Sequence, residues 1–227
     1  MPEGKGHRPK AVVSWSSGKD SAWALVRARR DYEVVAALTT LSEPDARVAM
    51  HGVRREIMRA QAAALGLPLI EVPIPSPCPN AVYEARMAAA MREVEGWGAR
   101  TLIFGDLFLE DIAAYRRAKL EPLGVEAVFP LWGRDTAQLA REMIDGGLRA
   151  KVVCVDPRRL DASFVGREFD AEFQRDLPAD VDPCGENGEF HTCVYESPDF
   201  DRPLVLLPGA VSTRDGFVFA DFALGEA

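Results

Sequence analysis

The sequence predicts an α/β protein, with a Rossmann-like, mostly parallel sheet covered by helices on both faces and a smaller C-terminal α+β region. From Lys10 to Val155, short apolar runs alternate with amphipathic stretches, the pattern of βαβ units. Several runs are apolar almost without interruption, as in strands buried on both faces of a parallel sheet. The alternation stops after Asp156. We therefore expect a flexible tail at 1–9, a large domain at 10–139 and a smaller region at 140–227.

The first half of the large domain has three expected strands. Residues 10–15 form a short β-branched run, 33–41 (EVVAALTTL) are almost continuously apolar, and 69–74 read LIEVPI. Apolar residues recur on one face of the intervening stretches 20–30 and 51–65, which predicts two helices. Gly66 follows the second stretch, at a position where helix C-caps favour glycine.

The second half continues the alternation. A stripe of Tyr83, Met87, Met91 and Val94 predicts a helix over 80–95. By the same patterns, further helices are expected at 110–120 and 136–145, and strands at 101–108 (TLIFGDLF), 126–132 (EAVFPLW) and 150–155 (AKVVCV). Beyond them we expect a short helix near 168–176, a long polar loop, and a β-hairpin around the turn signal Arg214-Asp215-Gly216.

Composition narrows the class of protein. The chain has 227 residues, of which 48% are hydrophobic and 27% charged, as is typical of a globular protein with a sizeable core. We find neither an apolar run of the roughly 20 residues that a membrane helix needs nor a signal peptide, so we expect no membrane association and a cytoplasmic location. The net charge of −8 disfavours a nucleic-acid partner. The four cysteines are widely spaced, which predicts neither a disulfide framework nor a zinc site.

The most informative stretch is SSGKDS, residues 16–21, between the first expected strand and helix. It departs from the common ATPase loop because the expected glycine five residues before Gly18 is missing and Asp20 occupies the Ser/Thr position. Its place still directs backbone N–H groups and a helix N-terminus toward an anion. Three hydroxyls, a glycine, a lysine and a carboxylate suit a pyrophosphate with a metal ion. The alternative is that Asp20 or Ser21 only caps the helix.

This loop resembles the pyrophosphate loop, S-G-G-x-D-S, of the N-type ATP pyrophosphatases, the PP-loop superfamily with a HUP-type fold. The resemblance implies that ATP is cleaved between its α and β phosphates and that a substrate is adenylated. It implies ATP and Mg²⁺ as cofactors, Asp20 as the metal ligand, and Lys19 beside the leaving pyrophosphate. Ser17 replaces the second glycine, so the backbone there either accepts a left-handed conformation at some cost or is remodelled.

Three further stretches, 50–69, 104–136 and 185–192, resemble the diphthine–ammonia ligases of that superfamily. The resemblance covers most of residues 11–193 and implies an AMP- and pyrophosphate-forming ligase that amidates an adenylated carboxylate with ammonia. On this basis the expected ATP-binding residues are Ser14, Ser16, Ser17, Gly18, Lys19, Asp20, Ser21, Thr39, Gly105 and Asp106. Thr39 and Asp106 lie near the carboxyl ends of expected strands, which is where ligands bind in parallel sheets. The alternative for Asp106 is that it only caps the next helix.

The loop GENGEFHT, residues 185–192, is densely polar. Its carboxylates, amide, imidazole and hydroxyl suit a site that holds an acceptor and moves protons. The expected catalytic residues are Lys19, Asp20, Glu186, Glu189 and His191. The expected substrate-binding residues are His51, Arg134, Glu186, Asn187, Gly188, Glu189 and Thr192. The alternatives are a solvated turn for this loop, a surface role for Arg134 and a capping role for His51.

The same loop departs from the family in one respect. Ligases that make diphthamide typically carry E-G-G-E-[FY]-E here, whereas this chain has E-N-G-E-F-H, similar to a bacterial subgroup. An imidazole, His191, therefore replaces a carboxylate, and we expect the acceptor to be an unidentified carboxylate other than diphthine. Two other functions remain open, a PP-loop tRNA-modifying enzyme and a non-catalytic ATP-binding sensor. A homodimer through the C-terminal hairpin is also expected.

Overall fold

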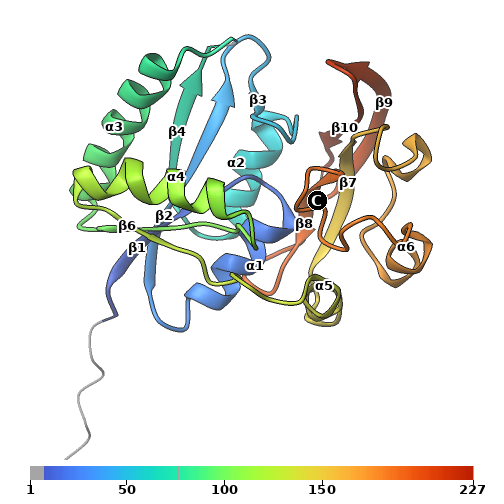
Figure 1. Ribbon diagram of the computed structural model, residues 1–227, viewed down its shortest axis with the longest axis horizontal. Coiled ribbons are helices and arrows are strands. Elements are labelled where there is room, and N and C mark those ends of the chain that lie inside the picture. The colour runs from blue at the N-terminus through green and yellow to red at the C-terminus, as the bar shows by residue number, and fades with distance from the viewer. Residues whose placement is uncertain (1–7, 76, 227) are drawn as a thin grey trace, which may run out of the picture.

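The computed structural model describes residues 8–75 and 77–226, and its larger sheet is mostly parallel. β1 (Lys10–Ser14) pairs with β2 (Glu33–Ser42) on one side and β5 (Thr101–Ile103) on the other. The sheet continues with β4 (Leu69–Ile74) beside β2 and β6 (Glu126–Val128) beside β5, while β3 (Arg47–Val48) runs antiparallel to the end of β2. This arrangement confirms the predicted fold class (Figure 1).

Helices cover both faces of this sheet, and the alternation of side chains along β1 shows how (Figure 1). Ala11 and Val13 join a core formed with α1 (Lys19–Ala28), α2 (Arg55–Ala64) and α5 (Thr136–Asp145). Val12 points to the other face, where α3 (Asn80–Gly96) and α4 (Glu110–Leu120) pack. In the described residues, no helix is long and apolar enough to cross a membrane.

The C-terminal part forms a second, antiparallel sheet in the order β8-β7-β10-β9, which lies beside α1 and α2 (Figure 1). Its strands are β7 (Arg149–Val155), β8 (Phe190–Glu196), β9 (Leu206–Arg214) and β10 (Phe217–Leu224), with the short helix α6 (Ala171–Asp176) nearby. The predicted hairpin corresponds to β9–β10. β9 is an edge strand of this sheet, and its side chains Leu207 and Val211 are exposed. The homodimer expected through it stays a prediction.

One apolar cluster joins the two sheets. It includes Val13 from the parallel sheet, Trp23 from α1, and Val152 and Phe190 from the antiparallel sheet. The C-terminal region therefore shares its core with α1, α2 and α5, and the boundary at 139–140 stays a prediction.

Several element ends differ from expectation. β5 and β6 end at Ile103 and Val128, before the predicted ends at 108 and 132. α2 begins at Arg55 rather than at 51, because residues 47–54 form a tight reversal in which Val48 N–H donates to the carbonyl of Val53. Its turn includes Gly52 at φ +67°, a left-handed conformation that suits glycine.

Candidate active site

The loop between β1 and α1 contains a residue in the left-handed conformation, one of the two possibilities expected for Ser17. Ser17 has φ +70° and is fully buried. Its carbonyl accepts hydrogen bonds from Val194 N–H at 2.9 Å and from Gln61 Nε2 at 3.2 Å. A left-handed serine costs on the order of 1–3 kcal/mol. These two hydrogen bonds hold the loop in that conformation and connect it to β8 and to α2.

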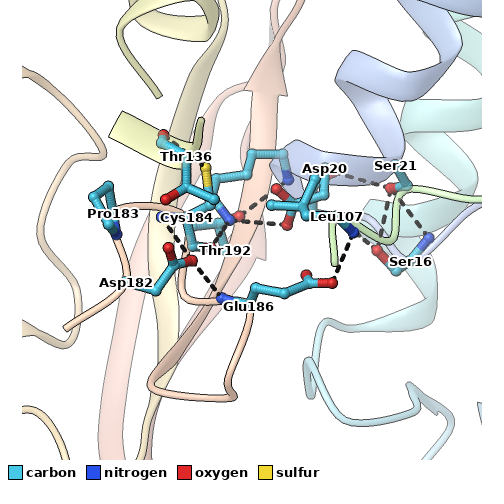
Figure 2. Close-up of polar contacts among 12 residues, drawn as sticks. Ser16, Asp20, Ser21, Leu107, Thr136, Asp182, Pro183, Cys184, Glu186 and Thr192 are labelled. Atoms are coloured by element: carbon cyan, nitrogen blue, oxygen red, sulfur yellow. Dashed lines mark hydrogen bonds and ion pairs between the residues drawn. The ribbon is translucent and has the colours of Figure 1, made fainter. Parts of the chain in front are cut away.

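Hydroxyl groups stabilise the rest of the loop from within. Ser16 Oγ donates to Ser21 Oγ at 3.1 Å, and Ser21 Oγ donates to the carbonyl of Gly18 at 2.9 Å (Figure 2). Gly18 is required by close approach, because a Cβ at this position would lie 2.5 Å from His51 Cε1. The loop therefore presents a fixed backbone at the N-terminus of α1, the place where an anion is favoured.

Gln61 is a site residue that the sequence analysis did not identify. It is fully buried in α2, and besides the bond to Ser17 its Nε2 donates to the carbonyl of Val194 at 2.6 Å. Its Oε1 accepts from Trp15 Nε1 at 3.0 Å. Gln61 thus joins both ends of the loop to β8. A polar residue one turn after Ile57, on the apolar face of a helix, was the available signal.

Lys19 points away from the solvent. Its Nζ forms an ion pair with Asp20 Oδ2 at 2.8 Å, donates to the carbonyl of Cys184, and lies 5.1 Å from the centre of the Phe190 ring. Burial opposes its charge, but Asp20, Cys184 and Glu186 together outweigh burial, so the pKa of Lys19 is raised. The backbone N–H of Lys19 donates to Thr192 Oγ1 at 3.0 Å. The lysine therefore attaches the loop to the C-terminal region.

A groove of about 500 Å³, here called the central groove, lies in front of this loop. It is lined by the loop, by the ends of β1 and β5, by residues 49–51 and by the 185–192 loop. Of the residues predicted for the site, the groove brings together Ser14, Ser16, Asp20, Ser21, His51, Gly105, Asp106, Glu186, Asn187, Gly188, His191 and Thr192. Stretches predicted from distant parts of the chain thus meet at one edge of the sheet, as parallel topology favours.

Three carboxylates, those of Asp20, Asp106 and Glu186, face this groove, and each has different partners. Asp106 forms an ion pair with Arg116, with Nε 3.0 Å from Oδ2. Glu186 Oε1 accepts from Leu107 N–H at 2.7 Å, and its own N–H donates to Asp182 Oδ2 at 2.9 Å (Figure 2). Burial, together with the nearby charges of Asp20 and Asp106, raises the pKa of Glu186 to about 7. Glu186 can therefore exchange a proton near neutral pH.

Asp20 supplies the atom that fits a magnesium ion. Its Oδ2 is paired with Lys19, whereas the buried Oδ1 has no hydrogen-bond partner within 8–75 and 77–226. Magnesium at nucleotide sites is usually held by one or two carboxylates together with substrate phosphates. The described residues contain no group of three or more metal-ligating side chains. The donor set thus fits a magnesium ion shared with phosphates.

His51 and His191 form a pair of rings whose centroids are 4.7 Å apart. Because His51 Nδ1 lies 3.0 Å from the carbonyl of Thr192, it carries the proton and leaves Nε2 as an acceptor. Burial lowers the pKa of His51 to about 4. Burial, then the charges of His51 and Lys19, lowers the pKa of His191 well below its usual value. Both imidazoles are therefore neutral at neutral pH.

Other predicted residues lie outside the groove lining. Thr39 is buried and donates to the carbonyl of Trp15 at 2.7 Å, while its neighbour Thr40 faces a cavity. Arg134 forms an ion pair with Glu142 of α5 at 2.7 Å. Glu189 is buried, and its Oε1 accepts from Asn187 Nδ2 at 3.1 Å within the loop itself. In this structure the three side chains contact other parts of the protein rather than the groove, and their predicted roles stay predictions.

A second space, the inner cavity, adjoins the central groove and has a volume of about 420 Å³. It shares Ser14, Ser16, Ala49, Phe104 and Arg116 with the groove and extends between the sheet and the helices α3 and α4. Apolar side chains such as Leu38, Met87 and Leu102 contribute to its wall. A flat apolar group can enter here while a charged group stays at the loop.

Comparison with known proteins gives matches over most of the chain. The family model of the diphthamide synthase N-terminal domain matches residues 9–126, and that of the diphthamide synthase C-terminal domain matches residues 135–211. A diphthine–ammonia ligase of Schizosaccharomyces pombe is 31% identical over 104 residues, which are 42% of this chain and 17% of that protein. The Homo sapiens diphthine–ammonia ligase is 25% identical over 150 residues, 63% of this chain and 54% of that protein. The match thus spans about half or less of these relatives.

Proposed function

Because the chain belongs to the diphthamide synthase family of the PP-loop superfamily, we propose that it is an ATP-dependent ligase that amidates a carboxylate and releases AMP and pyrophosphate. The relatives are named for joining ammonia to diphthine. We propose ammonia as the second substrate here too, with a different acceptor, because His191 stands where diphthamide-forming members typically carry a carboxylate.

The observation that supports this proposal most strongly is the convergence of groups in the central groove. The fixed loop at the N-terminus of α1, the open carboxylate oxygen of Asp20, and the proton-exchanging Glu186 face the same space. A protein that only binds ATP would need no more than the loop. A ligase also needs a group that handles protons close to the reacting phosphate, and Glu186 provides it.

The proposed reaction has two steps. An oxygen of the acceptor carboxylate attacks the α-phosphorus of ATP, and pyrophosphate leaves with the electron pair of the broken bond. Ammonia then attacks the carbonyl carbon of the acyl-adenylate, AMP leaves, and one proton passes from the nitrogen to a base. The carboxylate oxygen alone is a poor leaving group, which is why adenylation precedes amide formation.

Each part of the site has a role in this scheme. The first turn of α1 at Asp20 and Ser21, which lines the groove, would hold the pyrophosphate, and the inner cavity would take the adenosine. Asp20 would hold magnesium, which when bound neutralises phosphate charge. Ionised Glu186 would accept the proton from the nitrogen, while the neutral pair of His51 and His191 would line the acceptor side.

The proposal is tested by product analysis. Purified protein is incubated with Mg-ATP, ammonium and a panel of carboxylic acids, and nucleotides and phosphates are separated by ion exchange. We expect AMP and pyrophosphate in equal amounts, dependent on an acceptor. ADP and orthophosphate would refute cleavage between the α and β phosphates. ATP binding without turnover across the panel would instead support a sensor, and AMP formation that requires tRNA would support a tRNA-modifying enzyme.

Glu186 also predicts a pH dependence of stability. Because its folded pKa is about 7 and its usual value is 4.5, the unfolded chain ionises first as pH rises. Its contribution to the free energy of unfolding is therefore fully present below about pH 4.5 and is lost as pH rises to about 7. Urea denaturation across this range should show a shallower decline for Glu186→Gln, whereas Glu93→Gln, on the exposed face of α3, should follow the wild type. Parallel curves for all three proteins would contradict the shifted pKa.

A further inference from the structure

A third space, here called the hairpin cavity, has a volume of about 390 Å³ and lies between residues 42–52 and the β9–β10 hairpin. It shares Ala49, Met50 and His191 with the central groove, so the two spaces meet at the histidine. The hairpin cavity also shares Val48 and Ala49 with the inner cavity, so it is a neighbour of the space proposed for the adenosine. A molecule in the hairpin cavity would thus reach the central groove beside His191, next to the bound nucleotide.

The walls of the hairpin cavity are largely apolar. Val48, Ile74 and Pro75 contribute from the N-terminal part, and Phe217 and Phe219 from β10. The two parts come into close contact because Gly52 has no side chain. A Cβ on Gly52 would lie 3.0 Å from the Phe219 ring, and its φ of +67° is in the left-handed region. The cavity is therefore built jointly by both parts of the chain.

Arg214 is a charged group in this cavity with unused hydrogen-bonding capacity, and the carboxylates Asp45 and Asp215 also line the cavity. Its guanidinium lies 4.5 Å from the centre of the Phe219 ring, and Asp45 Oδ2 is 4.0 Å from its Nη1. The buried Nε has no hydrogen-bond partner in the part of the chain that the structure describes. Arg47, by contrast, is engaged by Asp221 Oδ1 at 2.8 Å and by the carbonyl of Gly52 at 2.7 Å. The guanidinium of Arg214 can therefore pair with an anionic group that enters the cavity.

We propose that the hairpin cavity binds the acceptor, and that the acceptor is a small carboxylic acid with an apolar or aromatic body and a second anionic group. The body lies against Phe217 and Phe219, the second anion pairs with Arg214, and the reacting carboxylate reaches the central groove past His191. The orientation rests on the proposed ligase reaction. The anion-binding property of the cavity does not, so it can be measured separately.

Cys78 allows this measurement because it lines the cavity and is partly exposed, whereas Cys154, Cys184 and Cys193 are buried. The probes are two aromatic disulfides. 5,5′-Dithiobis(2-nitrobenzoate) carries two carboxylates, and 4,4′-dithiodipyridine is neutral. In each case the Cys78 thiolate attacks one sulfur, a mixed disulfide forms, and one aryl thiolate leaves and is followed by absorbance.

We expect Arg214→Gln to slow modification by the dianionic reagent about tenfold, because the paired charge is lost, and to change the rate with the neutral reagent less than twofold. Arg214→Lys, which keeps the charge, should retain most of the wild-type rate with the dianionic reagent. The control Arg202→Gln removes an exposed arginine elsewhere and should change neither rate. The neutral reagent also detects any change in the thiol itself.

Equal slowing with both reagents, or no slowing with either, would overturn the inference. Failure of the proposed function gives a different result. If the protein forms no AMP but prefers the dianionic reagent through Arg214, the ligase reaction is wrong and the anion-binding cavity stands. If AMP forms and the preference is missing, the acceptor binds elsewhere.

Discussion

Asp20→Asn is expected to lower AMP formation by a factor of about 100 or more. Asp20 Oδ1 is buried without a hydrogen-bond partner among the described residues, next to the loop where the phosphates are proposed to lie. An amide has nearly the same shape but lacks the charge that holds magnesium. Steady-state AMP release measures the loss, and titration with a fluorescent ATP analogue, with and without magnesium, should show that magnesium no longer tightens nucleotide binding.

The matched control is Asp106→Asn. Asp106 faces the same groove, but Arg116 already pairs with it, so we expect a smaller loss of activity and a normal effect of magnesium. Asp20→Asn also leaves Lys19 buried without its partner, which destabilises by about 3–5 kcal/mol. Activity is therefore measured below the melting temperature of the variant. Full turnover in folded Asp20→Asn, or loss of the magnesium effect in Asp106→Asn alone, would reject the assignment.

The fold was predictable because its parallel strands are short apolar runs with helices between them. β8 was missed because its residues continue the polar loop that ends near Thr192, and its pairing with β7 depends on contacts distant in sequence. The start of α2 was misplaced because Gly52 and Val53 belong to a chain reversal, although their apolar spacing continues that of the helix. Periodicity detects the buried face of an element better than its ends.

The candidate site was predictable where chain position determines geometry. Loops that follow parallel strands meet at one edge, which brought Asp20, Gly105 and Asp106 together. Side-chain direction was not predictable. Lys19 sits in the loop as expected, yet its Nζ points to Cys184 and the Phe190 ring. Its proposed role beside the pyrophosphate stays a prediction. That role requires the ion pair between Lys19 and Asp20 to open.

Gly105 shows how closely the parallel sheet and the loop are fitted together. It follows β5, and a Cβ there would lie 2.7 Å from the carbonyl carbon of Asp20 and 2.8 Å from the backbone nitrogen of Ser21. These are backbone atoms in the first turn of α1, so they cannot move aside as a flexible side chain can. The absence of a side chain at residue 105 therefore sets the distance between the sheet edge and the loop.

Gly105→Ala is accordingly expected to lower the free energy of unfolding by about 2–4 kcal/mol in urea denaturation, because the added methyl forces β5 and α1 apart. The same shift moves Asp20 and Ser21, so AMP formation should fall even where the variant is fully folded. Gly96→Ala is the control. It lies at the end of α3, where a Cβ meets open space, and should leave stability unchanged or raise it by up to about 1 kcal/mol. If Gly105→Ala proved as stable and active as Gly96→Ala, the close contact between the sheet edge and the loop would not be what positions Asp20.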